Sequence, residues 1–128
     1  MKIKLVRIIL CLCCALMMSA CGTAKKPTGV YKTDVSASYY HDKFNGRKTA
    51  SGAIFNNNKL TTAHPSLPFG TQLKVTNRAN GKSVIVTVTD RGPFTKGREL
   101  DLTKRAFMGI TDNKNKGVLQ VDIEIVKQ

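Results

Sequence analysis

Four stretches of the chain alternate between apolar and polar residues, which is the pattern of β-strands that bury one face. They are residues 35–40, 73–76, 84–88 and 119–125. In the third stretch Val84, Val86 and Val88 share one face, whereas Ile85 and Thr87 occupy the other. The pattern predicts a domain that is mostly β.

Turn residues separate these stretches. Asn80 and Gly81 lie between the second and the third, and they predict a tight hairpin because both residues tolerate positive φ. The sequence Leu-Pro-Phe-Gly at residues 67–70 predicts another turn.

One short helix is predicted from Thr103 to Met108. Either Thr103 or Asp101 lies near its N-cap, where a side-chain oxygen accepts backbone N–H groups, and Gly109 ends the helix. Short strands, tight turns and one short helix favour a small closed barrel, because closure leaves no exposed sheet edge.

The first 20 residues do not fit this pattern. Residues 5–20 are mostly apolar, and three cations stand near the start of the chain: Lys2, Lys4 and Arg7. A membrane-spanning helix needs about 20 apolar residues, so this shorter run predicts a signal peptide. Residues 16–21 (Leu-Met-Met-Ser-Ala-Cys) resemble a bacterial lipobox, in which Cys21 is lipidated and becomes the first mature residue. The alternative is an ordinary secretory signal cut nearby.

These features divide the chain into three parts. Residues 1–20 are predicted to be a lipoprotein signal peptide, residues 21–33 a tether, and residues 34–128 the folded domain. Segment 22–29 supports the tether, because it is small and polar.

Cysteine usage excludes several kinds of chemistry. Once residues 1–20 are removed, only Cys21 remains, and it is expected to carry lipid. Disulfides, thiolate zinc sites and a cysteine nucleophile are therefore excluded, and about 95 residues must fold by hydrophobic packing alone. The two histidines and the scattered acids lack the close spacing of a metal site. We expect neither a metal nor a cofactor.

The charge of the chain indicates its class of partner. It carries 21 basic and 8 acidic residues, a net charge of +13, and without the signal peptide 18 basic residues remain, a net charge of +10. An exported basic domain is attracted to anionic envelope polymers and lipid headgroups. Export and the scatter of the basic residues argue against nucleic acid. The alternative is that many of these lysines only solvate the surface.

The run Thr-Asp-Arg-Gly-Pro-Phe at residues 89–94 follows the stretch 84–88 directly. It places the carboxylate of Asp90 at the rim of a β-sheet, where a substrate can reach it. A second cluster, Thr-Thr-Ala-His, ends upstream at His64. Together they suggest a polysaccharide-processing site. The alternatives are an Asp90 that accepts turn N–H groups or pairs with Arg91, and a buried His64 that joins loops.

The order and spacing of these motifs resemble the rare lipoprotein A (RlpA) family. The resemblance covers nearly everything from Val35 to Val126. The matching segments are residues 37–40, 45–52, 62–64, 67–71, 75–77, 80–81, 90–94, 97–98 and 101–103. It implies an all-β fold, a six-stranded double-psi β-barrel with one or two short helices. It also implies an endolytic lytic transglycosylase that cleaves peptidoglycan glycan strands between N-acetylmuramic acid and N-acetylglucosamine.

The family chemistry needs few residues. The 6-hydroxyl of muramic acid attacks the anomeric carbon and closes a 1,6-anhydro ring, so one carboxyl group can act first as acid and then as base. Glycoside hydrolases normally use two carboxylates. We expect Asp90 to fill this role. We expect His64 to bind Asp90, orient the sugar or share the proton.

Six further residues are candidates for substrate contact: Tyr40, Arg47, Thr49, Arg91, Phe94 and Asp101. Tyr40 and Phe94 can stack on a sugar, although barrel packing fits them equally well. A cation beside Asp90 would weaken it as an acid. Arg91 therefore either points away, toward Asp101 or a substrate carboxylate, or Asp90 acts mainly as a base.

One residue departs from the family pattern. The family usually carries a Glu after Thr-Ala-x-Gly, but here residues 49–52 are followed by Ala53. Activity is then reduced or absent if that carboxylate assists catalysis. Two alternatives remain open: an expansin-like protein that binds the wall without cleavage, and a structural envelope lipoprotein. In each case we expect a monomer anchored by lipid at Cys21 in the bacterial envelope, facing the periplasm from the outer membrane in a Gram-negative cell.

Overall fold

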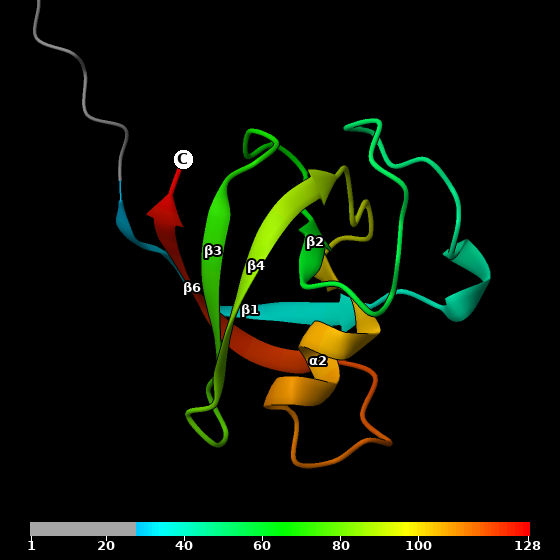
Figure 1. The fold of residues 1–128 in the computed structure, drawn as a ribbon. Coiled ribbons are helices and arrows are strands. Elements are labelled where there is room, and N and C mark those ends of the chain that lie inside the picture. Colours follow the sequence, from blue (N-terminus) through cyan, green and yellow to red (C-terminus); the bar gives the residue numbers. More distant parts are fainter. Residues whose placement is uncertain (1–27) are drawn as a thin grey trace, which may run out of the picture.

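The computed structural model describes residues 28–128, so the predicted signal peptide and Cys21 lie outside the described residues. Six strands in this part of the chain close into a barrel in the order β1-β5-β2-β4-β3-β6 (Figure 1). The strands are β1 Gly29–Tyr39, β2 Thr61–Ala63, β3 Gln72–Asn77, β4 Ser83–Asp90, β5 Arg98–Leu102 and β6 Leu119–Lys127. The pairs β1–β5 and β2–β4 are parallel, and the other pairs are antiparallel. The six-stranded barrel is confirmed.

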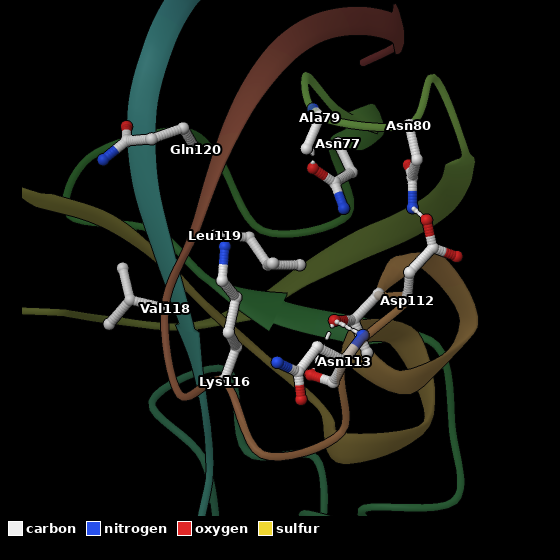
Figure 2. Close-up of a pocket in the computed structure, with 10 residues that line it drawn as sticks. Asn77, Ala79, Asn80, Asp112, Asn113, Lys116, Val118, Leu119 and Gln120 are labelled. Atoms are coloured by element: carbon white, nitrogen blue, oxygen red, sulfur yellow. Dashed lines mark hydrogen bonds between the residues drawn. The ribbon is translucent and has the colours of Figure 1, made fainter.

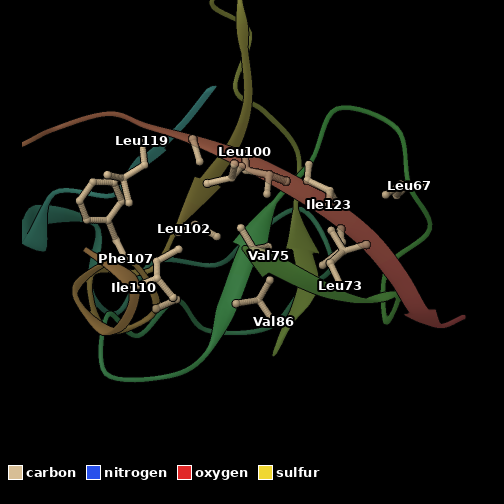
Figure 3. Close-up of a cluster of buried hydrophobic side chains, with 14 of the residues drawn as sticks. Leu67, Leu73, Val75, Val86, Leu100, Leu102, Phe107, Ile110, Leu119 and Ile123 are labelled. Carbon is tan, nitrogen blue, oxygen red and sulfur yellow. The ribbon is translucent and has the colours of Figure 1, made fainter. Parts of the chain in front are cut away.

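The alternating patterns point into the barrel as predicted. Leu73 and Val75 of β3 and Val86 and Val88 of β4 are all fully buried, and Leu73 pairs with Val86. Burying one such side chain contributes about 1.5–3 kcal/mol. Figure 3 shows this core, whose buried residues run from Ala37 to Ile125, and Tyr31 and Val35 of β1 pack against it.

The first strand begins earlier than predicted. Gly29 pairs with Ile125 and Lys32 pairs with Ile123, so residues 29–33 belong to β1 and not to the tether. The sequence hides this half of the strand for two reasons. Register shifts on both sides of Lys32 break its alternation, and most of its residues face solvent.

The helix also extends further than predicted. Helix α2 spans Lys104–Ile110, and Thr103 is its N-cap, whose side chain accepts the N–H of Ala106. Gly109 lies inside the helix and does not end it. A helical glycine costs about 1 kcal/mol, but Phe107 and Ile110 are both fully buried, and that burial outweighs the cost. Asp101 lies in β5, away from the cap. A 3₁₀ turn, η1 Asp42–Phe44, is the second short helix.

Strand β2 lies between two strands that each carry an acidic residue at the same level. Its last residue, Ala63, pairs with Asp90 at the end of β4 and with Asp101 in β5. The barrel thus brings together two carboxylates that lie eleven positions apart in the sequence. Within residues 28–128, no helix is long and apolar enough to cross a membrane.

Candidate active site

Asp90 is held by three hydrogen-bond donors from three segments. The hydroxyl of Tyr40, just after β1, donates to Oδ2 at 2.7 Å. The backbone N–H groups of Ala50 and Arg91 donate to Oδ1, each at 2.9 Å. Donors that point at a carboxylate stabilise its charged form and fix its orientation. The side chain is therefore anchored at the rim of the barrel.

Asp101 is engaged less completely. Its Oδ1 accepts a hydrogen bond from the hydroxyl of Ser38. Its Oδ2 has no hydrogen-bond partner within residues 28–128. The turn after Asp90 passes close to this oxygen, because a Cβ built on Gly92 would lie 3.9 Å from it. Gly92 has a φ of 117°, so a larger residue would also be strained there.

Tyr40 is influenced by both carboxylates. Burial, the hydrogen bond to Asp90 and the negative charges of Asp90 and Asp101 all raise the pKa of Tyr40. The phenol therefore keeps its proton and remains a donor to Asp90. Its ring packs against Phe44 and Phe55, with centroids 5.7 and 4.5 Å away, so the hydroxyl is the part directed at the carboxylate.

Asp90 and Asp101 have no cationic partner among the described residues, which is unusual for so basic a domain. Residues 28–128 contain 16 lysines and arginines and all eight acidic residues of the chain. Six of the acids have a cationic side chain within 4.0 Å: Asp34, Asp42, Glu99, Asp112, Asp122 and Glu124. Among the described residues, only Asp90 and Asp101 have no such partner. Cations are thus kept away from the two carboxylates that share β2.

Arg91 accounts for part of this separation. Its Nη1 donates to the carbonyl oxygens of Leu67 at 2.8 Å and His64 at 3.3 Å. Its guanidinium lies over the ring of Phe69, 3.9 Å from the centroid. The side chain therefore points away from Asp90, as the first alternative expected. It is directed at backbone carbonyls and an aromatic ring, and not at Asp101.

His64 is buried and does not meet the Asp90 carboxylate. Only 1% of it is exposed. Its Nδ1 accepts the N–H groups of Ser66 at 3.0 Å and Leu67 at 2.9 Å, and its Nε2 lies 2.9 Å from Oε1 of Glu99. The proton of the neutral ring must therefore be on Nε2. The expected side-chain contact with Asp90 is replaced by a backbone bond, in which His64 N–H donates to the Asp90 carbonyl at 3.1 Å.

Glu99 is a site residue that the sequence analysis missed. Its Oε1 also accepts a hydrogen bond from Nζ of Lys32 at 2.9 Å. Burial opposes the charge of Glu99, but the hydrogen bonds from Lys32 and His64 outweigh it and lower its pKa. Burial likewise lowers the pKa of His64, and the nearby Glu99 only partly offsets this. The pair is therefore a neutral histidine that donates to a charged glutamate.

The loop of residues 49–53 folds over Asp90. The Thr49 hydroxyl donates to the carbonyl of Ala53 at 2.9 Å and lies 2.9 Å from the hydroxyl of Ser51. Thr49 is thus occupied within the loop. Ala53 is exposed, and it belongs to the same loop as the Ala50 N–H that binds Asp90. A carboxylate at residue 53 would therefore extend from the loop that covers the site.

Two other candidates lie at different distances from the site. Phe94 is 86% exposed, and its ring lies 3.7 Å from where a Cβ on Gly92 would stand. It is an apolar surface beside Asp101 that packing does not use. The Arg47 guanidinium lies 5.4 Å from the centroid of Phe44, whose ring packs against Tyr40.

Two pockets lie outside this cluster. Figure 2 shows one of about 250 Å³ between the β3–β4 hairpin and the loop before β6, and Asn80, Asp112 and Lys116 line it. It is next to the start of β4, whereas Asp90 is at its end. A larger pocket of about 560 Å³ lies beside α2. No group of three metal-ligating side chains occurs within residues 28–128.

Comparison with known sequences identifies the family. Residues 32–123 match the double-psi β-barrel family described as lytic transglycolase. The chain belongs to this family. The match covers all six strands of the barrel at least in part, so the resemblance noted from the motifs is confirmed.

Relatives in this family carry transglycosylase names. The chain is 48% identical over 107 residues to the probable endolytic peptidoglycan transglycosylase RlpA of Treponema pallidum, covering 84% of this chain and 31% of that protein. It is also 48% identical over 107 residues to the endolytic peptidoglycan transglycosylase RlpA of Pasteurella multocida, covering 82% of this chain and 35% of that protein. The chain therefore spans about a third of the length of these curated relatives.

Solved structures share the lytic transglycolase family's barrel at lower identity. A Clavibacter michiganensis expansin superimposes with a TM-score of 0.59 at 24% identity, over 75% of this chain and 50% of that one. The Streptomyces papain inhibitor gives 0.57 at 23% identity, over 81% and 96% of the two chains. These likenesses show the fold alone, and proteins with such different titles illustrate that the barrel does not determine the chemistry.

Proposed function

We propose that this domain is an endolytic peptidoglycan lytic transglycosylase. It cleaves glycan strands between N-acetylmuramic acid and N-acetylglucosamine and leaves a 1,6-anhydro end. The observation that carries the proposal is the pair Asp90 and Asp101, the two acids without a cationic partner among the described residues. The names of the relatives support the same reaction.

The two carboxyl groups fit different tasks, and we propose that Asp101 takes the acid–base role that the sequence analysis expected of Asp90. Asp90 accepts three donors, which suits a fixed negative charge that stabilises the oxocarbenium-like centre. Asp101 has a free oxygen, which suits proton transfer. In the first step Asp101 protonates the leaving glycosidic oxygen as the bond to the anomeric carbon breaks. In the second step the muramic 6-hydroxyl bonds to that carbon and returns its proton to Asp101. The proton balance closes without water.

Other residues position these groups. Tyr40 orients Asp90, and the His64–Glu99 pair holds the loop whose carbonyls keep Arg91 away from it. His64 has both ring nitrogens engaged, which favours this supporting task over proton transfer to the substrate. Phe94 offers an exposed ring on which a sugar can stack.

The test is incubation of purified residues 22–128 with isolated peptidoglycan, followed by mass analysis of the soluble products. The proposal expects fragments that end in 1,6-anhydromuramic acid. Reducing ends would show hydrolysis. Wild-type domain that releases no product would exclude the enzyme.

A second candidate function rests on Ala53. A double-psi barrel without the usual Glu can bind glycan and leave it intact. In that case the domain binds sacculi in a pull-down but releases no product, and the Ala53→Glu variant releases no more product than the wild type. Product release by the wild type would reject this candidate.

We further propose that the protein is attached to its membrane by lipid at Cys21, as a monomer. The small residues before Cys21 support this proposal. The protein should partition into detergent and incorporate labelled palmitate, and Cys21→Ser should abolish the label. Labelling that persists in this variant would place the anchor elsewhere.

A further inference from the structure

The pocket of about 560 Å³ beside α2 is lined almost entirely by polar side chains. It lies between α2 and the lobe of residues 41–60, which joins β1 to β2. Its lining residues are Asp42, Asn45, Asn57, Asn58, Lys104, Arg105 and Met108. None of them belongs to the Asp90 cluster described above.

Most oxygen acceptors of this pocket are already occupied. Asp42 accepts hydrogen bonds from Asn57 Nδ2 at 2.8 Å and from Lys104 Nζ at 3.3 Å. Asn45 Oδ1 accepts the N–H of Asn57 at 2.8 Å, and Asn57 Oδ1 accepts the N–H of Lys104 at 2.9 Å. Only the side-chain oxygen of Asn58, Oδ1, has no donor among the described residues.

The donors are in surplus. Arg105 uses Nη1 to bind the Asn58 carbonyl at 2.9 Å, and its other N–H groups have no acceptor within residues 28–128. The same holds for the side-chain amide groups of Asn45 and Asn58. Two cations, Lys104 and Arg105, stand against one acid, Asp42. A pocket with spare donors and net positive charge fits an anionic oxygen ligand.

The lobe adds to this positive field. It contains four further cations without a salt bridge among the described residues: Lys43, Arg47, Lys48 and Lys59. Asp42 is its only acid, and the hydrogen bonds from Asn57 and then Lys104 lower the pKa of that carboxyl, so it remains charged. The surplus of positive charge therefore extends around the pocket and would attract an anionic polymer.

The pocket is joined to the candidate active site through one residue. Asn57 Nδ2 donates to the Tyr40 carbonyl at 3.1 Å, and the hydroxyl of the same tyrosine donates to Asp90. A ligand in the pocket and a sugar at Asp90 would therefore lie on two sides of Tyr40.

We propose that this pocket binds a carboxylate carried by the glycan strand, with Arg105 and Lys104 as its cationic contacts. The inference rests on the proposed function in one respect, which is that the carboxylate belongs to a peptidoglycan glycan strand. Two groups of peptidoglycan have this chemistry: the free lactyl group of muramic acid, and the terminal carboxylate of a peptide stem. Binding at this pocket would set which sugar lies at Asp90.

Matched ligands test the pocket directly. Residues 22–128 are titrated by NMR with three probes: N-acetylglucosaminyl-N-acetylmuramic acid, its muramoyl-dipeptide counterpart, and chitobiose, which lacks any carboxylate. We expect at least one acidic probe to bind about tenfold more tightly than chitobiose, as charge-assisted hydrogen bonds would provide, and to shift the amide signals of Asn58 and Arg105. The probe that binds identifies the source of the carboxylate.

Variants decide whether the pocket is responsible. Arg105→Gln should remove most of the preference for the acidic probe, and Arg105→Lys should restore part of it. Lys116→Gln, in the pocket of Figure 2, should change nothing. Equal affinity for chitobiose, absence of binding, shifts confined to other residues, or an unchanged preference in Arg105→Gln would each overturn the inference. The titration needs no cleavage. If the wild type binds the acidic probe here but releases no product from peptidoglycan, the proposed function is rejected and the pocket inference stands.

Discussion

At the scale of single residues, the surroundings of Asp90 and Asp101 matter more than their identity. Both carboxylates lie beside Ala63, and Arg91, the nearest cation in the sequence, is directed at carbonyls and Phe69. Asp90 has three donors and Asp101 has one. On this difference rests our proposal that Asp90 stabilises charge and that Asp101 transfers the proton.

Tyr40→Phe tests the support of Asp90. The variant loses the hydroxyl but keeps the ring contacts with Phe44 and Phe55. A hydrogen bond to a charged group contributes about 1.5–3 kcal/mol, so we expect the rate of product release to fall at least about tenfold while the fold is unchanged. Tyr39→Phe, whose ring packs on Phe107, is the matched control. Equal rates in both variants would mean that the Tyr40 hydroxyl does not support catalysis.

Because His64 is buried, we expect the free energy of unfolding to fall in mild acid. Burial lowers its pKa below the ordinary value of 6.5, so as pH falls the unfolded chain binds the proton first. The free energy of unfolding should therefore decrease from about pH 6.5 downward. Glu99→Gln removes a charge that favours protonated His64, so its decline should be steeper.

Chemical denaturation between pH 7.5 and 5 measures this effect. Glu124→Gln, from the exposed pair with Lys74, should follow the wild type. Stability that is constant across this range in both wild type and Glu99→Gln would contradict the neutral, buried state of His64.

The sequence analysis singled out Asp90 and His64 as candidates but did not predict the partners of His64. Asp90 ends a strongly alternating strand before a Gly-Pro turn, so its position at the rim could be inferred. Glu99 and Lys32 are 67 positions apart, and their contact depends on the parallel pairing of β1 with β5. Alternation in β5 did place Glu99 and Asp101 on one face, opposite Leu100 and Leu102, and this was the available signal.

At the scale of elements, strong alternation predicted strands well, and their ends less well. β6 reads clearly because its buried and exposed residues alternate from Leu119 to Ile125. The first half of β1 lacks such a clear alternation. Its register is shifted twice, and its pairing depends on β6, which is distant in the sequence. The end of α2 was missed for a similar reason, since Ile110 is held by the barrel core.

Thr103 links α2 to the segment that leads into β2 and should be important for stability. Its hydroxyl donates to the Lys59 carbonyl and accepts the Ala106 N–H, and the residue is fully buried. Thr103→Val keeps the shape and loses both bonds, so we expect the free energy of unfolding to fall by about 1–3 kcal/mol. Urea denaturation measures this. Thr87→Val, on the outer face of β4, is the control, and an equal effect in both would reject the capping account.

At the scale of the whole molecule, the start of β1 limits how far the barrel reaches. Eight residue steps separate Cys21 from Gly29, so an anchored domain begins at most about 30 Å from its lipid. The barrel would then act on the wall layer nearest to its membrane. The proposed attachment thus restricts the substrate by distance.

The net charge of +10 predicts how the domain binds the wall. Exposed charges are screened at high salt, so binding of residues 22–128 to purified sacculi should weaken from low salt to about 0.5 M. Asp90→Asn should bind almost as the wild type does. A pull-down across a salt series is the measurement. Binding that resists salt and is lost in Asp90→Asn would place the affinity in the active site instead.

The central claim is that Asp90 and Asp101, the two carboxylates kept apart from cations, perform the chemistry. The most direct test compares the release of 1,6-anhydromuramic ends from purified peptidoglycan by wild type, Asp90→Asn, Asp101→Asn and Asp112→Asn. Asp112 is the control because it is exposed and paired with Lys82. The account predicts release by wild type and Asp112→Asn, and a loss of at least about a hundredfold in the other two variants, all of them folded. Release by Asp90→Asn and Asp101→Asn at the wild-type rate would contradict it.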